Sequence, residues 1–318
     1  MNDIAAPYDL DALEDGKVLG LLLQELLGCR VTRFAEIGAG FYAAVYEAWL
    51  DGEPEHVVVK WHKYSGYSAR EGAQLKLLSR HAILRVPEVY GIHRHTPDLP
   101  YEALVMEHIP GVNASKIQFP SDRVKARFIE QVLDNLLAWH GVESPEGYGD
   151  IGGPFYPTWL GCLSARVGTY QDRVHADRHR DTVSPYVMGV IDRSAERLPE
   201  ILAGADGRAS LVHSDYNLWN VLYDPRTFQV TGVIDPIDAE WNDPEIDLFH
   251  LPNCRPDVGL LERYLERVKV SEGFSLRYAF YRFWDDVKHY LRMGWYEEKR
   301  FRTYARALEE EMIAHGLA

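Results

Sequence analysis

Four polar side chains whose types suit catalysis are concentrated in one stretch of the chain. His213 and Asp215 follow a short apolar run, and Asn220 lies five residues after Asp215 in the same polar loop. Asp235 follows fifteen residues later, directly after the apolar run Val230–Ile234. Carboxylate and amide oxygens suit a general base and the ligands of a hard cation such as Mg²⁺. The stretch therefore predicts a divalent-metal site with a neighbouring base, a combination that metal-dependent hydrolysis or phosphoryl transfer would use.

A second set of residues, nearer the N-terminus, suits the binding of phosphate groups. Gly38 and Gly40 lie in a turn between two expected strands, Val45 follows them, and Lys60 lies at the end of an apolar run. Glu71 opens the next expected helix and would pair with Lys60, because a buried lysine needs an anionic partner. Each feature also has a plainer explanation: the glycines fit an ordinary hairpin turn, and Lys60 could reach solvent from a strand end.

The elements that must position these residues follow from the spacing of apolar side chains. Helices are predicted over 9–27 and 68–80, and strands over 31–37, 43–50, 56–61, 86–90 and 102–108. After Pro110–Gly111 the pattern is mostly helical, with helices predicted over 121–139, 158–173, 186–198, 260–268, 275–295 and 299–314. A short hairpin with a turn at Asp224–Pro225 carries the catalytic stretch. The pattern favours an α+β protein with a strand-rich beginning and a larger helical remainder.

Composition excludes several classes of function. The chain has 318 residues, of which 46% are apolar, and a formal net charge of −14. Such a charge disfavours nucleic acid and anionic membrane as partners and suits a neutral or cationic small molecule. Three scattered cysteines offer neither a disulfide framework nor a metal motif. The acidic beginning of the sequence lacks the features of a secretory signal, so we expect a cytoplasmic protein without membrane spans.

Taken in order, these motifs resemble a known fold. Gly38, Gly40, Lys60 and Glu71, then the hinge-like segment 104–107, the loop His213-x-Asp215-x4-Asn220, and Asp235–Pro236 look like a protein-kinase-like fold. The sequence is most similar to its small-molecule branch, the aminoglycoside phosphotransferase superfamily, which includes choline kinases and fructosamine kinases. The resemblance implies a bilobal α+β protein: a small antiparallel-sheet nucleotide-binding lobe over residues 1–108, and a larger, mostly helical catalytic lobe over 109–318.

The resemblance also implies roles for individual residues. Asp215 would be the catalytic carboxylate that orients the attacking hydroxyl and accepts its proton, and Asn220 and Asp235 would hold Mg²⁺. ATP would bind through Lys60 and the other residues of the first lobe, namely Gly38, Gly40, Val45, Glu71 and the hinge residues Met106, Glu107 and His108. His213 and Asp247 would brace the catalytic loop, and Asp243 before Pro244 is an alternative helix cap. Family members usually have glycine where this chain has Ser214.

The acceptor is harder to predict. Its candidate contacts lie after Asp235 and on the late aromatic helix: Asp238, Glu240, Trp284, Asp285 and Trp295. Carboxylates beside aromatic rings suit a polyhydroxylated, cationic molecule, but the aromatic residues at helical spacing also fit an ordinary core. We expect a kinase for a fructosamine-like ketosugar or amino sugar. The alternatives are an aminoglycoside (antibiotic) O-phosphotransferase and, less favoured, a non-catalytic nucleotide-binding pseudokinase.

Overall fold

The structure is a computed structural model that describes residues 7–8, 10, 16–97, 99–176, 181–205, 207–236 and 238–317. Contacts divide the chain into two compact units. Unit 1 comprises the residues up to Ala138 together with Leu218–Asp238, and unit 2 comprises Trp139–Asn217 and Ala239–Ala318. Each unit is described by itself below.

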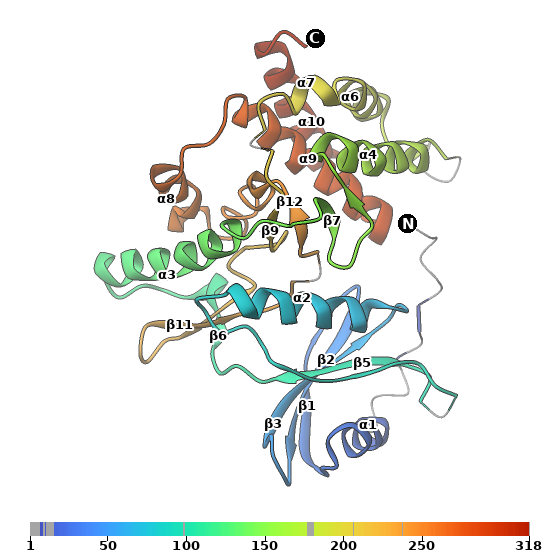
Figure 1. The fold of residues 1–318 in the computed structure, drawn as a ribbon, viewed down its shortest axis with the longest axis vertical. Helices are drawn as coiled ribbons and strands as arrows, with labels where there is room; N and C mark the ends of the chain where they lie inside the picture. The colour runs from blue at the N-terminus through green and yellow to red at the C-terminus, as the bar shows by residue number, and fades with distance from the viewer. Residues whose placement is uncertain are drawn as a thin grey trace. The chain divides into compact units, whose positions relative to one another are not determined.

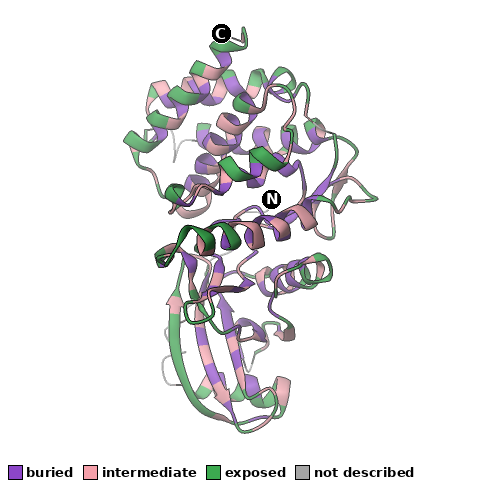
Figure 2. Cartoon of the chain, turned by 90° about the vertical axis from the view of Figure 1, so that its left-hand side faces the viewer, coloured by how far each residue is buried: buried purple, intermediate pink, exposed green. Residues whose placement is uncertain are grey.

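Unit 1 is built on a five-stranded antiparallel sheet with the strand order β1-β2-β3-β5-β4. Figure 1 labels β1, β2, β3 and β5 of this sheet. Its strands are β1 (Val31–Ala39), β2 (Ala43–Leu50), β3 (His56–His62), β4 (Val89–His93) and β5 (Glu102–Glu107). The edge strand β1 is largely exposed (Figure 2), whereas β3 and β5 are largely buried.

Two helices cover opposite faces of this sheet. Helix α1 (Lys17–Leu27) buries Leu22 in a cluster that includes Val105 of β5. Helix α2 (Tyr67–His81) lies so close to the other face that a side chain at Gly72 would meet Leu104. Successive residues of a strand point to opposite faces, so Val105 and Leu104 identify the two sides. The face toward α2 carries Lys60, at the level of Leu104 in the strand register.

The rest of unit 1 comes from two distant parts of the chain. Strand β6 (Val112–Asn113), the 3-10 turn η2 (Ala114–Lys116) and helix α3 (Asp122–His140) follow the sheet directly. Strands β10 (Val221–Asp224) and β11 (Gln229–Val233) form the hairpin predicted at Asp224, and β6 pairs with β10. On α3, Asn135 accepts hydrogen bonds from the N–H groups of Ile83 and Leu84, at 2.9 Å each.

These contacts explain why the division into units differs from the predicted boundary at residue 108. Strand pairing joins β6 to β10 in a second sheet, and the Asn135 side chain ties α3 to Ile83 and Leu84, so residues 109–138 and 218–238 belong to unit 1. Local patterns do not reveal such pairing between distant segments. As a boundary between a nucleotide-binding and a catalytic part, 108/109 stays a prediction.

Unit 2 combines a four-stranded sheet with most of the later helices. The sheet order is β8-β7-β12-β9, with β7 (Tyr148–Asp150), β8 (Phe155–Tyr156), β9 (Ser210–Val212) and β12 (Glu240–Asn242). The helices are α4 (Trp159–His175), α6 (Pro185–Glu196), α7 (Leu198–Ile201), α8 (Leu260–Arg267), α9 (Phe274–Met293) and α10 (Glu298–Ala314), with 3-10 turns η3 (Pro244–Asp247) and η4 (Pro256–Val258).

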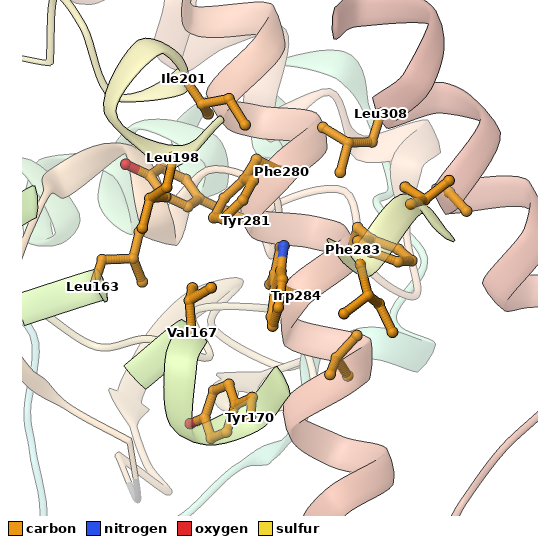
Figure 3. Close-up of a cluster of buried hydrophobic side chains, with 14 of the residues drawn as sticks. Leu163, Val167, Tyr170, Leu198, Ile201, Phe280, Tyr281, Phe283, Trp284 and Leu308 are labelled. Atoms are coloured by element: carbon orange, nitrogen blue, oxygen red, sulfur yellow. The ribbon is translucent and has the colours of Figure 1, made fainter. Parts of the chain in front are cut away.

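Helix α9 supplies the centre of the unit 2 core. Phe280 and Trp284 project from it toward Val167 of α4 and Leu198 of α7, whereas Phe283 lies toward Leu308 of α10 (Figure 3). All are nearly excluded from solvent. The aromatic spacing along the late helix therefore marks a core, which was the plainer of the two explanations that the sequence allowed.

Most predicted elements are confirmed to within a few residues, with three differences. The helix predicted from residue 9 begins at Lys17, and residues 11–15 lie outside the described part of the chain. The strand predicted over 86–90 begins at Val89, after Pro87, which has no N–H for a sheet ladder. Leu211 and Val212 pair with β12 and take no part in the hairpin with 230–234. None of the described helices is long and apolar enough to cross a lipid bilayer.

Candidate active site

In unit 1, Lys60 is a buried cation held between two carboxylates. Its Nζ lies 2.8 Å from Oε1 of Glu71 on α2 and 2.7 Å from Oδ1 of Asp235, which follows β11. Burial by itself would lower the pKa of Lys60, but the charges of Asp235 and Glu71 outweigh it and raise this pKa above its usual range. Lys60 is therefore protonated at neutral pH, fixed in position and 8% exposed.

Glu71 is held on both of its oxygens. Oε2 lies 2.7 Å from Nε2 of His62, whose Nδ1 in turn lies 2.8 Å from the hydroxyl of Ser68. Burial would raise the pKa of Glu71, but Lys60 and His62 lower it to about 2. The carboxylate is thus ionised, and moving it away from Lys60 would also break its contact with Nε2 of His62.

The turn between β1 and β2 is a tight hairpin end with open space above its glycines. The Gly40 N–H donates to the Ala43 carbonyl at 2.8 Å, and Lys63 Nζ donates to the Gly40 carbonyl at 2.8 Å. Gly38 and Gly40 do not adopt positive φ, so the backbone conformation does not require glycine there. No described atom lies within 4 Å of a Cβ built at Gly38. Glycine at this position leaves room for a ligand to approach the backbone closely.

Beside Lys60, the same sheet face carries an apolar surface and two of the hinge residues, Met106 and His108. Val45 pairs with Lys60, and Val58 pairs with Met106 at the next position on that face. Glu107 forms an ion pair with Arg85. His108 stacks on His56, with ring centroids 3.8 Å apart.

Asn220 and Asp235 bracket the β10–β11 hairpin, also within unit 1. The N–H of Ile234 donates to the Asn220 carbonyl at 2.9 Å, which ties the chain before Asp235 to Asn220. Asp235 has a φ of 61° and a side chain that is 46% exposed. A left-handed backbone at a residue other than glycine is strained, and such strain is concentrated at functional sites. Their oxygens are the ligand type that suits a hard dication.

In unit 2, Asp215 follows β9 and is oriented by two neighbours. Nδ2 of Asn217 donates to Oδ1 of Asp215 at 2.6 Å, and Nδ1 of His250 lies 3.4 Å from the same oxygen. The Asp215 side chain is 41% exposed, whereas His250 is buried. Asp215 is therefore an accessible carboxylate with a fixed orientation, as a base requires.

The backbone of the loop before Asp215 is held by Asp247 in η3. Its Oδ2 accepts from the His213 N–H at 3.0 Å and its Oδ1 from the Ser214 N–H at 2.6 Å. Burial would raise the pKa of Asp247, but His140 and neighbouring histidines lower it. The 3-10 turn is capped by Asp243, which accepts from the Glu245 N–H at 3.0 Å. Ser214 has a φ of 60°, the reason that glycine suits this position.

The residues expected to bind the acceptor have different environments. Arg166 of α4 holds both oxygens of Glu240, one of them at 2.8 Å, and Arg70 lies 3.7 Å from Asp238 in unit 1. Asp285 pairs with Lys288 at 2.6 Å and with His289 at 3.3 Å. Trp284 is a core residue that is 4% exposed, which corrects its expected place in a pocket, whereas Trp295 is 45% exposed.

Sequence reasoning missed several residues that shape these sites. Asn217 lies two residues after Asp215, and its position in the same polar loop was a usable signal. Arg166, His140 and His250 gave no such signal. Arg166 lies 74 residues from its partner Glu240, and His140 lies 107 residues from its partner Asp247. Neither residue belongs to a local motif.

Comparison with known proteins matches the chain to one family model and to a curated relative. The family model for the phosphotransferase enzyme family matches residues 33–284. The protein YcbJ of Escherichia coli K12 is 23% identical over 290 residues, covering 90% of this chain and 96% of its own length.

Solved structures with a similar fold include two kinases of small molecules. A candidate fructosamine-3-kinase of Thermobifida fusca superposes with a TM-score of 0.67 at 22% identity, covering 92% of this chain and 98% of its own. A thermostable variant of the aminoglycoside phosphotransferase APH(4)-Ia, solved with ADP and hygromycin B, gives 0.66 at 19% identity, covering 95% and 99%. The kinase-like α+β fold expected from the resemblance is confirmed.

Proposed function

Because this chain belongs to the phosphotransferase enzyme family and is a small-molecule kinase, we propose that it transfers the γ-phosphate of ATP to a hydroxyl of a polyhydroxylated small molecule. The single observation that carries the proposal is the buried Lys60, held between Glu71 and Asp235 beside an open glycine turn. A fixed, protonated ammonium at such a place is a binding partner for phosphate oxygens.

Each half of the chemistry has its own residues. In unit 2, Asp215 accepts the proton of the acceptor hydroxyl as its oxygen attacks the γ-phosphorus, and ADP leaves as the bond to the β-phosphate oxygen breaks. Asn217 and His250 keep the Asp215 carboxylate in one orientation. In unit 1, Lys60 binds the α- and β-phosphates, and Glu71 keeps Lys60 in place.

The donor set around Asp235 fits Mg²⁺. Asn220 supplies an amide oxygen and Asp235 a carboxylate with an exposed edge, both hard ligands. When bound, the ion neutralises charge that develops on the phosphate oxygens. Asp235 also accepts from Lys60, so the same carboxylate would link the cation to the lysine.

For the acceptor, we favour a fructosamine-like ketosugar over an aminoglycoside. Glu240 and Asp285, two carboxylates suited to ammonium groups, already pair with Arg166 and Lys288. A polycationic acceptor would have to displace these internal partners, whereas a ketosugar needs hydrogen-bonding groups and few free charges. The aminoglycoside alternative rests on the net charge of −14, which attracts cations to the whole surface.

The test is ADP release, measured by a coupled assay with glycated lysine, free amino sugars and aminoglycosides as acceptors. We expect the highest kcat/KM with the ketosugar. Asp215→Asn should lower kcat by about 10²- to 10⁴-fold, the usual contribution of a general base. The matched control is Asp122→Asn, an exposed residue in the first turn of α3.

Two results would contradict the proposal. The first is full turnover in Asp215→Asn. The second is no acceptor-dependent ADP release with any compound while ATP still binds, which would support the pseudokinase alternative. A kcat/KM that is higher for aminoglycosides would leave the phosphotransfer chemistry in place and replace only the acceptor.

A further inference from the structure

We propose that Glu47, His56 and His108 form a binding site for a transition-metal dication of the Zn²⁺ type in unit 1. Glu47 lies on β2, His56 opens β3, and His108 follows β5. One ligand atom from each lies within 4.8 Å of the other two. Among the described residues, this is the group of three acidic, histidine or cysteine side chains that meets this spacing.

Strand register explains how three separate segments bring these side chains together. Trp49 pairs with His56, and Val58 pairs with both Glu47 and Met106. Alternate residues of a strand share a face, so Glu47, His56 and His108 lie on the face that carries Lys60. The cluster occupies the part of that face beyond Val58 and Met106, away from Lys60.

The distances are close to those of a metal centre. Glu47 Oε2 lies 3.4 Å from His56 Nε2 and 4.0 Å from His108 Nε2. Ligand atoms around a tetrahedral zinc ion, at its usual bond lengths, are about 3.3–3.6 Å apart. The rings of His56 and His108 are stacked at an interplanar angle of 22°, so binding of both to one ion requires the imidazoles to rotate out of the stack, which leaves a fourth position for water.

The Nε2 atom of His56 independently points to a ligand. Nε2 of His56 is buried and makes no hydrogen bond within the described part of the chain. A buried polar atom without a hydrogen bond is costly, and a bound cation would satisfy it.

Aromatic and cationic side chains pack around the cluster. Trp49 stacks on His56 with centroids 4.3 Å apart, and the Arg33 guanidinium lies 3.5 Å from the Trp49 ring centroid. The side chains of the three ligands are 22–26% exposed, so an ion can enter from solvent. Two imidazole nitrogens and one carboxylate oxygen favour Zn²⁺, Ni²⁺ or Cu²⁺ over Mg²⁺ and Ca²⁺, which prefer oxygen ligands.

The test is a zinc titration of the full chain, without nucleotide or Mg²⁺, in competition with a chromophoric chelator. We expect one equivalent of Zn²⁺ to bind. Glu47→Gln, His56→Phe and His108→Phe should each weaken binding by about 10-fold or more. The phenylalanine variants keep the aromatic stack while removing the ligand atom. His81→Asn, at the exposed end of α2, is the matched control and should bind as the wild type does.

Co²⁺ provides a second readout, because its visible absorption reports a four-coordinate site with nitrogen ligands. The proposal is overturned if the wild-type chain binds no equivalent of Zn²⁺, or if all three variants bind it as tightly as the wild type. If a phenylalanine variant fails to fold, the nearly isosteric Glu47→Gln decides the outcome. None of these measurements uses turnover, so failure here is distinguishable from failure of the proposed kinase function.

Discussion

At the scale of single residues, the clearest feature is a series of hydrogen bonds and ion pairs. It runs from Ser68 through His62 and Glu71 to Lys60 and Asp235. Each member has a partner at 2.7–2.8 Å. Glu71 and Lys60 are almost fully buried. A buried ion pair contributes little net stability, but removal of one partner is costly because the other charge remains. We infer that the role of this series is to hold the Lys60 ammonium in position.

Glu71 should give the chain a distinct dependence of stability on pH. Its pKa is about 2 in the folded state against an ordinary value of 4.5. The folded state thus favours the ionised form, so the stabilisation is complete above pH 4.5 and is lost as the pH falls toward 2. We expect the difference in the free energy of unfolding between wild type and Glu71→Gln to shrink over this range by something on the order of 3 kcal/mol.

Urea unfolding of both proteins at a series of pH values measures this difference. Glu266→Gln, an exposed residue of α8, serves as the control and should follow the wild type. Parallel curves for wild type and Glu71→Gln between pH 4.5 and 2 would show that the Glu71 pKa is not depressed.

At the scale of elements, unit 2 depends on the contact between α9 and η3. Arg277 of α9 is fully buried and makes two hydrogen bonds to Glu245 of η3, at 2.7 and 3.0 Å. Tyr281, one turn later, donates to Asp243 at 2.8 Å. Since η3 also carries Asp247, these contacts indirectly fix the backbone that precedes Asp215.

Arg277→Met should therefore be strongly destabilising. It leaves Glu245 as a buried charge without its main partner, which typically costs about 3–5 kcal/mol in the free energy of unfolding. Arg302→Met on α10 removes an exposed pair with Glu298 and should cost less than about 1 kcal/mol. Chemical denaturation of the full chain compares the two.

A double variant tests the physical cause. Arg277→Met combined with Glu245→Leu removes both charges and should recover part of the loss. If the double variant is less stable than Arg277→Met alone, packing rather than the uncompensated charge determines the effect.

At the scale of the whole molecule, the chain passes repeatedly between two compact units. It leaves unit 1 after Ala138, returns at Leu218 and leaves again after Asp238. The residues proposed as base and as phosphate- and metal-binding groups are thereby divided: Asp215 belongs to unit 2, and Lys60, Asn220 and Asp235 belong to unit 1.

This division predicts that nucleotide binding and turnover are separable. ATP with Mg²⁺ should raise the Tm of the wild type and of Asp215→Asn, whereas Asp235→Asn should lose most of the shift. At a ligand concentration of 100 times Kd, the stabilisation amounts to about 2.7 kcal/mol. Thermal unfolding with ATP alone, Mg²⁺ alone and both together measures it. An equal shift for Asp235→Asn, or one independent of Mg²⁺, would remove Asp235 from the metal site.

The sequence by itself determined much about this protein. Periodicity and turn residues located most helices and strands, because those signals are local. The loop from His213 to Asn220 and the order of motifs around Lys60 predicted the family and its fold, because these groups are spaced along the chain in a fixed order.

Only the tertiary structure decided which side chains are paired and which are accessible. Lys60 and Asp235 are 175 residues apart, and Glu240 receives Arg166 from 74 residues away. Trp284 was a candidate ligand contact by type and is a core residue by position. Burial and pairing depend on segments that meet only on folding, so residue types and spacing restrict a side chain's possible roles, and its three-dimensional neighbours select among them.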